Sequence, residues 1–434
     1  MLDARPTSSE NSFDVLVVGG GPAGSTIATL LARRGERVLL VEKERHPRFH
    51  IGESLLPMNL PLFDELGVGD EIARIGIPKY GVEFVSPYHA TPSSYDFAES
   101  WDKQFDSAYE VRRSEFDHIL FRNAAAAGAL TLEGCRVTAV EFPSRGRVVA
   151  SARGDDGEEH RFTAKFLVDA SGRDTLLANK VARKVSNRRH HSAAVYGHFT
   201  GARRLPGKTE GNISVFWFDH GWFWFIPLRD GTTSVGVVCH ADFIKARKTD
   251  VTTFFKNVIA LSPALSDRLR DAELTGPATA TGNYSYTSDR IWGPGYLMVG
   301  DAYSFIDPVF SSGVYLAMQG AFFAADAVSA CLHNPQAEAE RMLSRYEADV
   351  KRAMVRFSWF IYRVNRPAIR ALFMQPANTL RMREAVLSLM SGDVFRQSPI
   401  HRRLRLFKSI YYLKTMAGEL ARLAARPVTR LGKI

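Results

Sequence analysis

The sequence predicts a doubly wound α/β domain, with a β-rich domain inserted into it and a helical region after it. Three observations predict this architecture: a strand–helix–strand unit around a glycine turn at residues 13–42, aromatic and β-branched runs at residues 213–238, and apolar residues at helical spacing after residue 314. The 434 residues are 45% hydrophobic and 24% charged. These values suit a folded chain of two domains and indicate neither a disordered nor a membrane protein.

The unit at residues 13–42 has the pattern of a dinucleotide-binding turn. An apolar, β-branched strand leads directly into residues 19–24, GGGPAG, and a helix and a second strand follow. Gly19 would allow the tight turn, Gly21 the approach of a pyrophosphate, and Gly24 the close packing of helix on strand. The phosphates would lie at the helix N-terminus, where free amides favour anions, and the acid that ends the second strand would bind the adenosine ribose. The predicted site residues here are Gly19, Gly21, Ala23, Gly24 and Glu42.

The inserted domain is predicted from short strands rich in aromatic residues. Strands are expected at residues 213–218, 222–227 and 234–238, and together they suggest an antiparallel sheet over the nucleotide site. Ordinary packing inside a sheet would also account for their alternating aromatic residues. The expected division of the chain is a dinucleotide-binding domain within residues 13–335, made of residues 13–75, 110–175 and 290–335, an inserted domain of residues 76–109 and 176–289, and a helical basic region of residues 336–434.

The C-terminal tail is strongly basic. Residues 401–434 contain nine Lys or Arg residues against one acid, Glu419, in a chain with a formal net charge of +10. The tail could pack its apolar stripe on the body of the protein, or it could meet an acidic carrier protein or an anionic membrane surface. No recognition motif accompanies the charge, so no nucleic-acid partner is expected. The stripe that predicts a basic amphipathic helix consists of Leu406, Ile410, Leu413, Ala417 and Leu420.

Signals for membrane insertion, secretion and metal binding are weak in the sequence. The nearest approach to an apolar span, residues 314–332, contains Gln319 and Asp326 and therefore predicts a buried helix. Residues 1–12 lack the apolar core of a secretory signal, so a cytoplasmic location without an integral membrane segment is expected. No metal is expected either, because the cysteines lack the paired spacing of a metal site; they are Cys135, Cys239 and Cys331.

A second nucleotide motif lies near residue 300. Residues 296–301 read as an apolar strand that ends in Gly300 and Asp301, and Pro308 follows after seven positions. This pattern resembles the second flavin motif of the para-hydroxybenzoate hydroxylase-like flavoproteins, whose aspartate binds the ribityl chain, and the resemblance implies FAD. A helix is expected to begin at residues 311–313, where free amides would point at the flavin or at a small anion such as halide. An ordinary helix cap is the alternative, since serine and glycine are common at helix starts.

Together with these motifs, further segments of the chain resemble segments of the flavin-dependent halogenases. The resemblance extends through most of the first 330 positions. The segment IGESLLP, which contains Ser54, resembles the family's flavin-contacting strap. The segment VRRSEFD resembles one whose arginine, here Arg113, lies near FAD, and Lys79 stands where the family has its catalytic lysine. The other matches are to the W-x-W-x-I-P signature, namely Trp222, Trp224, Ile226 and Pro227, and to the backbone halide site, namely Ser312 and Gly313.

The resemblance implies halogenation through an oxidised halide. Reduced FAD and oxygen would oxidise chloride or bromide to hypohalous acid, which would diffuse along a passage from which Trp222 and Trp224 exclude water. Lys79 would hold and polarise the halogen beside an electron-rich ring carbon, as an ammonium donor or as a transient haloamine. The enzyme would thus be an oxidoreductase of natural-product biosynthesis. Without the other motifs, Lys79 would be interpreted as an exposed loop lysine.

Phe310 narrows the expected substrate. Tryptophan halogenases have a glutamate just before the halide site, whereas this chain has Phe310, as phenol and pyrrole halogenases often do. The resemblance therefore implies a phenol or pyrrole substrate, either free or attached to an acyl or peptidyl carrier protein. No base is identified, although Glu83, Asp307 and His198 are polar candidates in the sequence, and His198 is more simply explained as a core histidine.

The sequence has no second nucleotide fingerprint for NADPH, so a separate flavin reductase is expected to supply reduced FAD. Three alternatives remain open. An FAD-dependent aromatic monooxygenase (hydroxylase) would need NADPH and no halide, and a prenyl-reductase-like flavoprotein would reduce a double bond without oxygen. A non-catalytic FAD-binding module that acts through its basic helix would leave every substrate unchanged.

Overall fold

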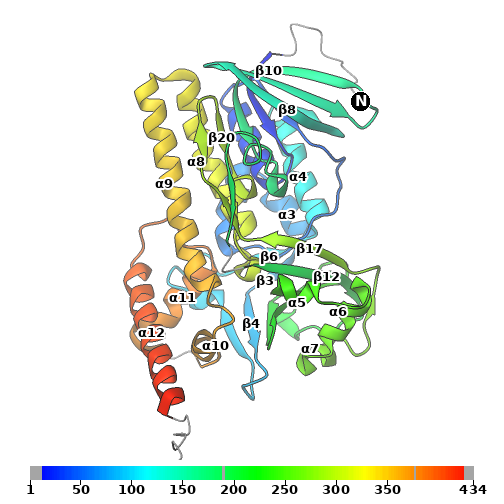
Figure 1. Cartoon of the computed structure of the whole chain (residues 1–434), viewed down its shortest axis with the longest axis vertical. Coiled ribbons are helices and arrows are strands. Elements are labelled where there is room, and N and C mark those ends of the chain that lie inside the picture. The colour runs from blue at the N-terminus through cyan, green and yellow to red at the C-terminus, as the bar shows by residue number, and fades with distance from the viewer. Residues whose placement is uncertain (1–11, 188–190, 376–377, 425–434) are drawn as a thin grey trace, which may run out of the picture.

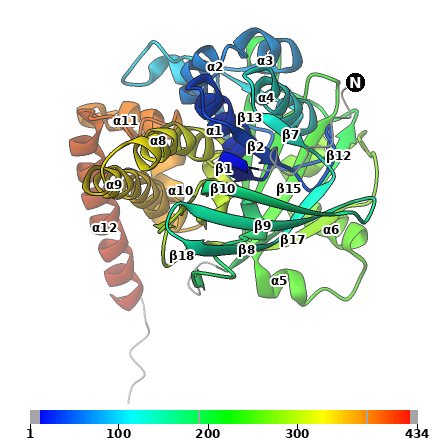
Figure 2. The same cartoon turned by 90° about the horizontal axis from the view of Figure 1, so that it is seen from above.

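The computed structural model describes residues 12–187, 191–375 and 378–424. The molecule is elongated, with one large sheet at the top of Figure 1, a second large sheet below it, and the C-terminal helices alongside. Seen from above, α9 (Gln336–Ile361) and α12 (Ile400–Ala424) lie at one side of the molecule and α6 (Val251–Ile259) at the other (Figure 2). The α/β architecture with a helical C-terminal region is therefore confirmed.

The first sheet has a parallel core of the doubly wound type. Strand β1 (Ser12–Val18) lies between β10 (Glu159–Asp169) and β2 (Val38–Val41), and every pairing among these three strands is parallel. Parallel strands β20 (Tyr296–Met298) and β7 (Leu130–Leu132) extend this core on its two sides; β20 is buried throughout, whereas β7 is a partly exposed edge strand. The remaining strands of the sheet are β7 (Leu130–Leu132), β8 (Cys135–Ser144), β9 (Arg147–Gly154), β19 (Trp292–Gly293) and β20 (Tyr296–Met298).

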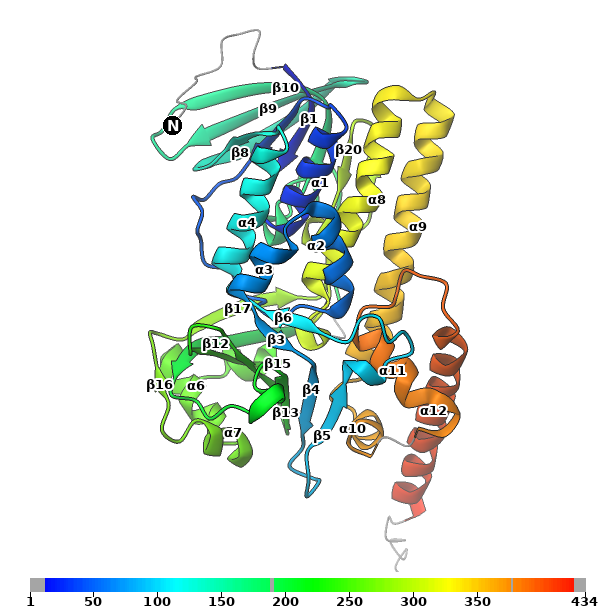
Figure 3. The same cartoon turned by 180° about the vertical axis from the view of Figure 1, so that it is seen from behind.

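Helix α1 (Pro22–Arg33) follows β1 directly, as the glycine turn predicts, and packs against α4 (Arg113–Ala126) and α8 (Gly313–His333). Helix α8 also packs against α9 (Gln336–Ile361) (Figure 3). Within the described ranges, α8 is the one helix that is long and apolar enough to cross a bilayer, but 56% of its most apolar window is buried inside the fold. The prediction of a buried helix after residue 314 is confirmed.

The second sheet contains the strands predicted between residues 213 and 238. Strands β13 (Ile213–Phe218), β14 (Gly221–Pro227) and β15 (Thr233–His240) form an antiparallel meander. Side chains alternate between the two faces, so Trp217, Trp222 and Trp224 join the main core, while Phe216, Phe223 and Phe225 join a second core. The helices that contribute to the second core are α5 (Ala241–Lys245), α6 (Val251–Ile259) and α7 (Pro263–Arg268).

The remaining strands of the second sheet extend the meander on both sides. On one side, β4 pairs in parallel with β13 and is followed by β5. On the other side, β12 pairs with β15, and β16 and β17 pair with β12. The bounds are β4 (Gly81–Val85), β5 (Ser93–Asp96), β12 (Ser192–Thr200), β16 (Glu273–Leu274) and β17 (Thr279–Tyr284).

Short strands join the two large sheets. Strands β3 (Ile77–Lys79) and β6 (Ala108–Glu110) form an antiparallel ladder at the junction, beside helices α2 (Leu60–Leu66) and α3 (Gly69–Ile75) (Figure 3). A second small sheet also connects the two halves; it consists of β11 (Lys184–Ser186), β18 (Tyr286–Ser288) and β21 (Ser304–Phe305).

The C-terminal region is helical, with α10 (Pro367–Met374), α11 (Met382–Met390) and α12 (Ile400–Ala424). Helix α12 packs against α10 and α11. Its buried side chains are Ile400, Leu404, Phe407 and Tyr411, whereas Leu413 and Ala417 are exposed. The predicted apolar stripe was therefore wrong in its second half, because these four side chains on a neighbouring row make the contact; the Leu420 side chain lies outside the described residues.

Candidate functional site

A cavity of about 630 Å³ lies between the two large sheets. It opens at the carboxyl ends of the parallel strands, because Val18, Ala170 and Val299, each at or just after the end of its strand, line it. Strand β14 of the second sheet forms part of the opposite wall, through Trp222, Trp224 and Ile226. The carboxyl edge of a parallel sheet is where α/β proteins bind ligands.

The glycine turn lines this cavity through Gly19, Gly21 and Ala23. Gly19 has φ +105°, and a β-carbon at Gly24 would lie 1.8 Å from the Gly19 carbonyl oxygen, so both positions require glycine. A β-carbon at Gly21 would find its nearest neighbour at 3.6 Å, which leaves open space beside the turn. No side chain caps the start of α1, so its first amides are available to a phosphate.

Glu42 braces the turn. Its Oε2 accepts a hydrogen bond of 2.6 Å from the amide of Gly20, and its Oε1 accepts one of 3.0 Å from the amide of Glu44. Glu42 also lines the cavity. Because each carboxylate oxygen can accept more than one hydrogen bond, this bracing is compatible with the predicted ribose contact.

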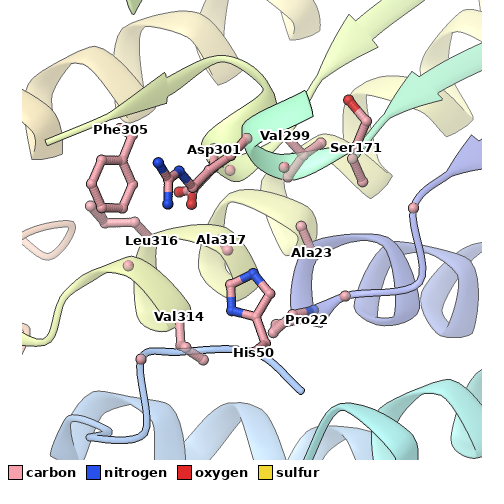
Figure 4. A pocket seen from close by; sticks show the side chains of 18 of the residues that line it. Pro22, Ala23, His50, Ser171, Val299, Asp301, Phe305, Val314, Leu316 and Ala317 are labelled. Atoms are coloured by element: carbon pink, nitrogen blue, oxygen red, sulfur yellow. The ribbon is translucent and has the colours of Figure 1, made fainter. Parts of the chain in front are cut away.

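Asp301 points into the cavity from the turn after β20 (Figure 4). Burial raises the pKa of Asp301 to about 6, and the nearby Arg173 and Arg113 charges oppose the shift. Its carboxylate makes no hydrogen bond within the part of the chain that the structure describes. A half-buried acceptor of this kind suits a ligand rich in hydroxyl groups, such as the ribityl chain.

The start of α8 also faces the cavity, through Ser312 and Gly313. The residue before them, Ser311, has φ +54°, and no side chain caps the helix. A β-carbon at Gly313 would meet nothing within 4 Å. Open space beside uncapped helix amides is compatible with the predicted anion site.

The aromatic wall is formed by Trp222 and Trp224, whose ring centroids lie 6.1 Å apart. The indole of Trp224 donates to Ser234 Oγ at 3.2 Å, whereas that of Trp222 has no hydrogen-bond partner among the described residues. Pro227 is buried at the end of β14 and is not part of the cavity wall.

Lys79 is buried, with 2% of its surface exposed. Its Nζ donates to Ser54 Oγ at 2.8 Å and to the Leu55 carbonyl oxygen at 3.0 Å, and it lies 3.8 Å from Glu110 Oε1. Ser54 lines the cavity, and Lys79 lies behind it. Burial lowers the pKa of Lys79, and the Glu110 charge opposes this shift. The side chain is therefore not that of an exposed loop lysine.

Arg113 holds the predicted strap in place. Its Nε and Nη2 donate to the two oxygens of buried Asp117, at 2.8 and 3.1 Å, and its Nη1 donates to the carbonyl oxygens of Ile51 and Gly52. Arg113, at the start of α4, lines the cavity together with Ser54 of the strap, so both predicted residues are brought to it.

Phe310 does not line the cavity. It is buried in a short 3-10 turn, Pro308–Phe310, with its ring centroid 6.4 Å from that of Phe373 and 6.5 Å from that of Phe360. Phe373 in turn packs against Phe84 at 5.1 Å. Phe310 therefore belongs to an aromatic cluster beside α10.

The three polar candidates have partners of their own. Glu83 Oε2 accepts from Arg268 at 2.6 Å, and Asp307 Oδ1 accepts from the amide of Val309 at 3.2 Å. His198 Nε2 lies 2.9 Å from Oε1 of Glu53, a buried residue that lines the cavity.

Sequence reasoning missed Glu53, Glu110 and His50. His50 also points into the cavity (Figure 4), and burial, with the Arg113 charge, lowers its pKa to about 4. For Glu110, the sequence did offer a signal, because a charged residue stands there within a short apolar segment.

Comparison with known proteins identifies the family. The model of the tryptophan halogenase family matches residues 14–98 and 88–422. The chain belongs to the tryptophan halogenase family. It is 39% identical over 329 residues to the tryptophan 2-halogenase of Chondromyces crocatus, a match that covers 74% of this chain and 62% of that protein, and so less than two thirds of that relative.

Two further relatives match almost end to end. The 1H-pyrrole-2-carbonyl-[peptidyl-carrier protein] chlorinase of Pseudomonas fluorescens is 30% identical, over 89% of this chain and 90% of that protein. The solved structure of the myxobacterial chondrochloren halogenase CndH, described as a variant of FAD-dependent halogenases, is 34% identical, with a TM-score of 0.78 over 90% of this chain and 92% of that one. Membership of this halogenase family confirms an oxidoreductase that uses FAD, with halide as co-substrate, and the glycine turn and Asp301 fit that cofactor.

Proposed function

We propose that this protein halogenates an electron-rich aromatic ring, a phenol or a pyrrole, with hypohalous acid that Lys79 directs, in natural-product biosynthesis. The observation that carries the proposal is the placement of Lys79, a buried ammonium hydrogen-bonded to Ser54 at the wall of the cavity. Bound reduced FAD, with oxygen, would supply the oxidation of chloride or bromide.

The cavity residues divide into a cofactor set and a halide set. The residues that would hold FAD are Gly19, Gly21, Ala23, Gly24, Glu42, Ser54, Arg113, Gly300 and Asp301. The backbone at Ser312 and Gly313 would hold the halide, because an uncapped helix N-terminus favours an anion. Trp222 and Trp224 would exclude water from the space between cofactor and substrate, with Ile226 and Pro227 packed beside them.

Lys79 has the donors that the role requires. An ammonium group has three N–H donors, of which Ser54 and Leu55 take two. The third has no hydrogen bond of normal length within the described residues, since Glu110 Oε1 lies at 3.8 Å. This donor would bind hypohalous acid that reaches it past Ser54, and burial would strengthen its electrostatic effect.

The presence of Phe310 before Ser312, where a carboxylate is absent, supports an electron-rich substrate, although Phe310 itself packs in the core and does not line the cavity. A phenol or pyrrole helps to expel its own ring proton, so Phe310 can stand where other members have a glutamate. The pyrrole chlorinase relative acts on a carrier-bound ring, which supports the carrier-bound form of the substrate. The basic surface of α12 is compatible with an acidic carrier protein.

The cellular setting is part of the proposal. A separate flavin reductase would supply reduced FAD, and the enzyme would act in the cytoplasm. The family to which the chain belongs supports the separate reductase, and the cytoplasmic location rests on the sequence expectation alone.

The test is direct. The protein is incubated with reduced FAD, oxygen and chloride or bromide, and with phenols, pyrroles and tryptophan, free or attached to a carrier protein. Mass spectrometry is expected to show halogen isotope patterns on a phenol or pyrrole. A hydroxylated product without halogen, or halogenation of tryptophan alone, would contradict the proposal.

A further inference from the structure

Glu110 is fully buried beside Lys79, and its carboxylate oxygens lack hydrogen-bond donors within the described ranges. It is 0% exposed, and neither carboxylate oxygen has a hydrogen bond of normal geometry among the residues that the structure describes. Its Oε1 lies 3.8 Å from Lys79 Nζ. Buried carboxylates are nearly always hydrogen-bonded, so this one requires an explanation.

The backbone holds Glu110 and Lys79 together. In the ladder of β3 with β6, Ile77 pairs with Glu110 and Lys79 pairs with Ala108, so the two charged side chains are diagonal neighbours on one face. An isolated bridge also pairs Ser54 with Glu110. Two strand pairings therefore bring Glu110 and Ser54 to the lysine that we propose as catalytic.

Glu110 and Lys79 form a pair of opposite charges in a buried site. Burial raises the pKa of Glu110 to about 8, and the Lys79 charge opposes this shift. Ser54 is near enough to lower that pKa, and Glu53, which pairs with His198, raises it. Because burial penalises both charged forms, a proton can lie on either partner without changing the net charge of the pair.

We propose that Glu110 is the positioning residue that exchanges a proton with Lys79 during halogen transfer, an inference that rests on the proposed function. The Lys79 proton moves to Glu110, and the neutral amine forms an N–halogen bond as the halogen–oxygen bond of hypohalous acid breaks. The departing hydroxide takes the proton from Glu110 and leaves as water. Glu110 ends as a carboxylate beside a charged haloammonium, so atoms, charge and electrons balance.

The first test measures Lys79 itself and needs no halogenation. In protein labelled with 13C at the lysine ε-carbons, the Lys79 signal is assigned by its loss in Lys79→Arg, and its pKa is measured by NMR titration. Glu110→Gln is expected to lower the pKa of Lys79 by about one unit or more, because the opposing charge is removed. Glu115→Gln, an exposed change five positions on, is the control. An unchanged Lys79 pKa in Glu110→Gln overturns the proposal.

The second test separates halogen transfer from halide oxidation. Glu110→Gln is expected to reduce substrate halogenation at least about tenfold, to shift its pH profile, and to leave the trapping of free hypohalous acid by monochlorodimedone unchanged. Glu110→Asp keeps the charge and is expected to recover part of the activity; it also serves if Glu110→Gln fails to fold. A wild-type rate and pH profile in either variant, or an equal loss of both activities, overturns the proposal. If the wild-type protein halogenates nothing, the proposed function fails, while the Lys79 titration still decides the role of Glu110.

Discussion

The indole of Trp224 lies directly over Gly236 of the neighbouring strand, where a β-carbon would come within 2.2 Å of Trp224 Cζ2. The ring is held in this position by its hydrogen bond to Ser234. The absence of a side chain at Gly236 thus sets the place of one tryptophan in the cavity wall.

Gly236→Ala is expected to displace Trp224 and to admit water to the cavity. Overpacking should lower the free energy of unfolding by about 1–3 kcal/mol, and the yield of halogenated product per reduced FAD should fall. Chemical denaturation and product quantification measure the two effects. The matched control is Gly276→Ala, where a β-carbon would meet nothing within 4 Å. Equal stability and equal product yield in the two variants would contradict the proposed role of Trp224 in excluding water from the cavity.

Glu42→Ala is expected to weaken FAD binding. The variant removes the charge-assisted acceptor of the Gly20 amide and leaves that donor without its partner in the turn. The dissociation constant for FAD should rise about 10- to 100-fold, as measured by fluorescence titration. Glu141→Ala, an exposed position outside the cavity wall, is the control. Wild-type affinity in Glu42→Ala would show that the turn does not need this brace.

Arg113→Ala is expected to destabilise the protein strongly, because it leaves the buried Asp117 carboxylate with Arg48 as its remaining ion-pair partner. The free energy of unfolding should fall by about 3 kcal/mol. The double variant Arg113→Ala/Asp117→Ala should be more stable than the single one, since no charge is then left unpaired. A double variant less stable than the single one would contradict this account.

Asp301 predicts a pH dependence of the FAD-free protein. Its pKa is raised in the fold from 3.8 to about 6, so the folded state binds more protons than the unfolded state between these values. The Asp301 contribution to stability is therefore present below pH 4 and lost as the pH rises through about 6.

Asp301→Asn should remove this loss. The variant is expected to unfold at higher denaturant concentration than the wild type at pH 8, with little difference at pH 4, and to bind FAD more weakly. Chemical denaturation at both pH values is the measurement. An equal gain at the two pH values would mean that the carboxylate charge is not the cause.

The parts of the fold that follow from local sequence were predictable. The turn of Gly19, Gly21 and Gly24 was predictable from their spacing, and backbone conformation at Gly19 and close packing at Gly24 explain why glycine is needed at these two positions. The strands around Trp222 and the helix after Gly313 were likewise indicated by periodicity.

The parts that depend on distant segments were not predictable. Glu110 becomes informative only when β6 pairs with β3, and His198 only when it meets Glu53 across 145 positions. The apolar stripe on α12 was misplaced at Leu413, because helical spacing does not say which of two neighbouring rows faces the body.

The central claim is that Lys79 directs an oxidised halogen to the ring. The most direct measurement counts free hypohalous acid and halogenated product together, in wild type, Lys79→Ala and the exposed control Lys103→Ala. We expect Lys79→Ala to form hypohalous acid at the wild-type rate and to yield about 100-fold less product, with Lys103→Ala unchanged. Product formation by Lys79→Ala at the wild-type rate would contradict the account.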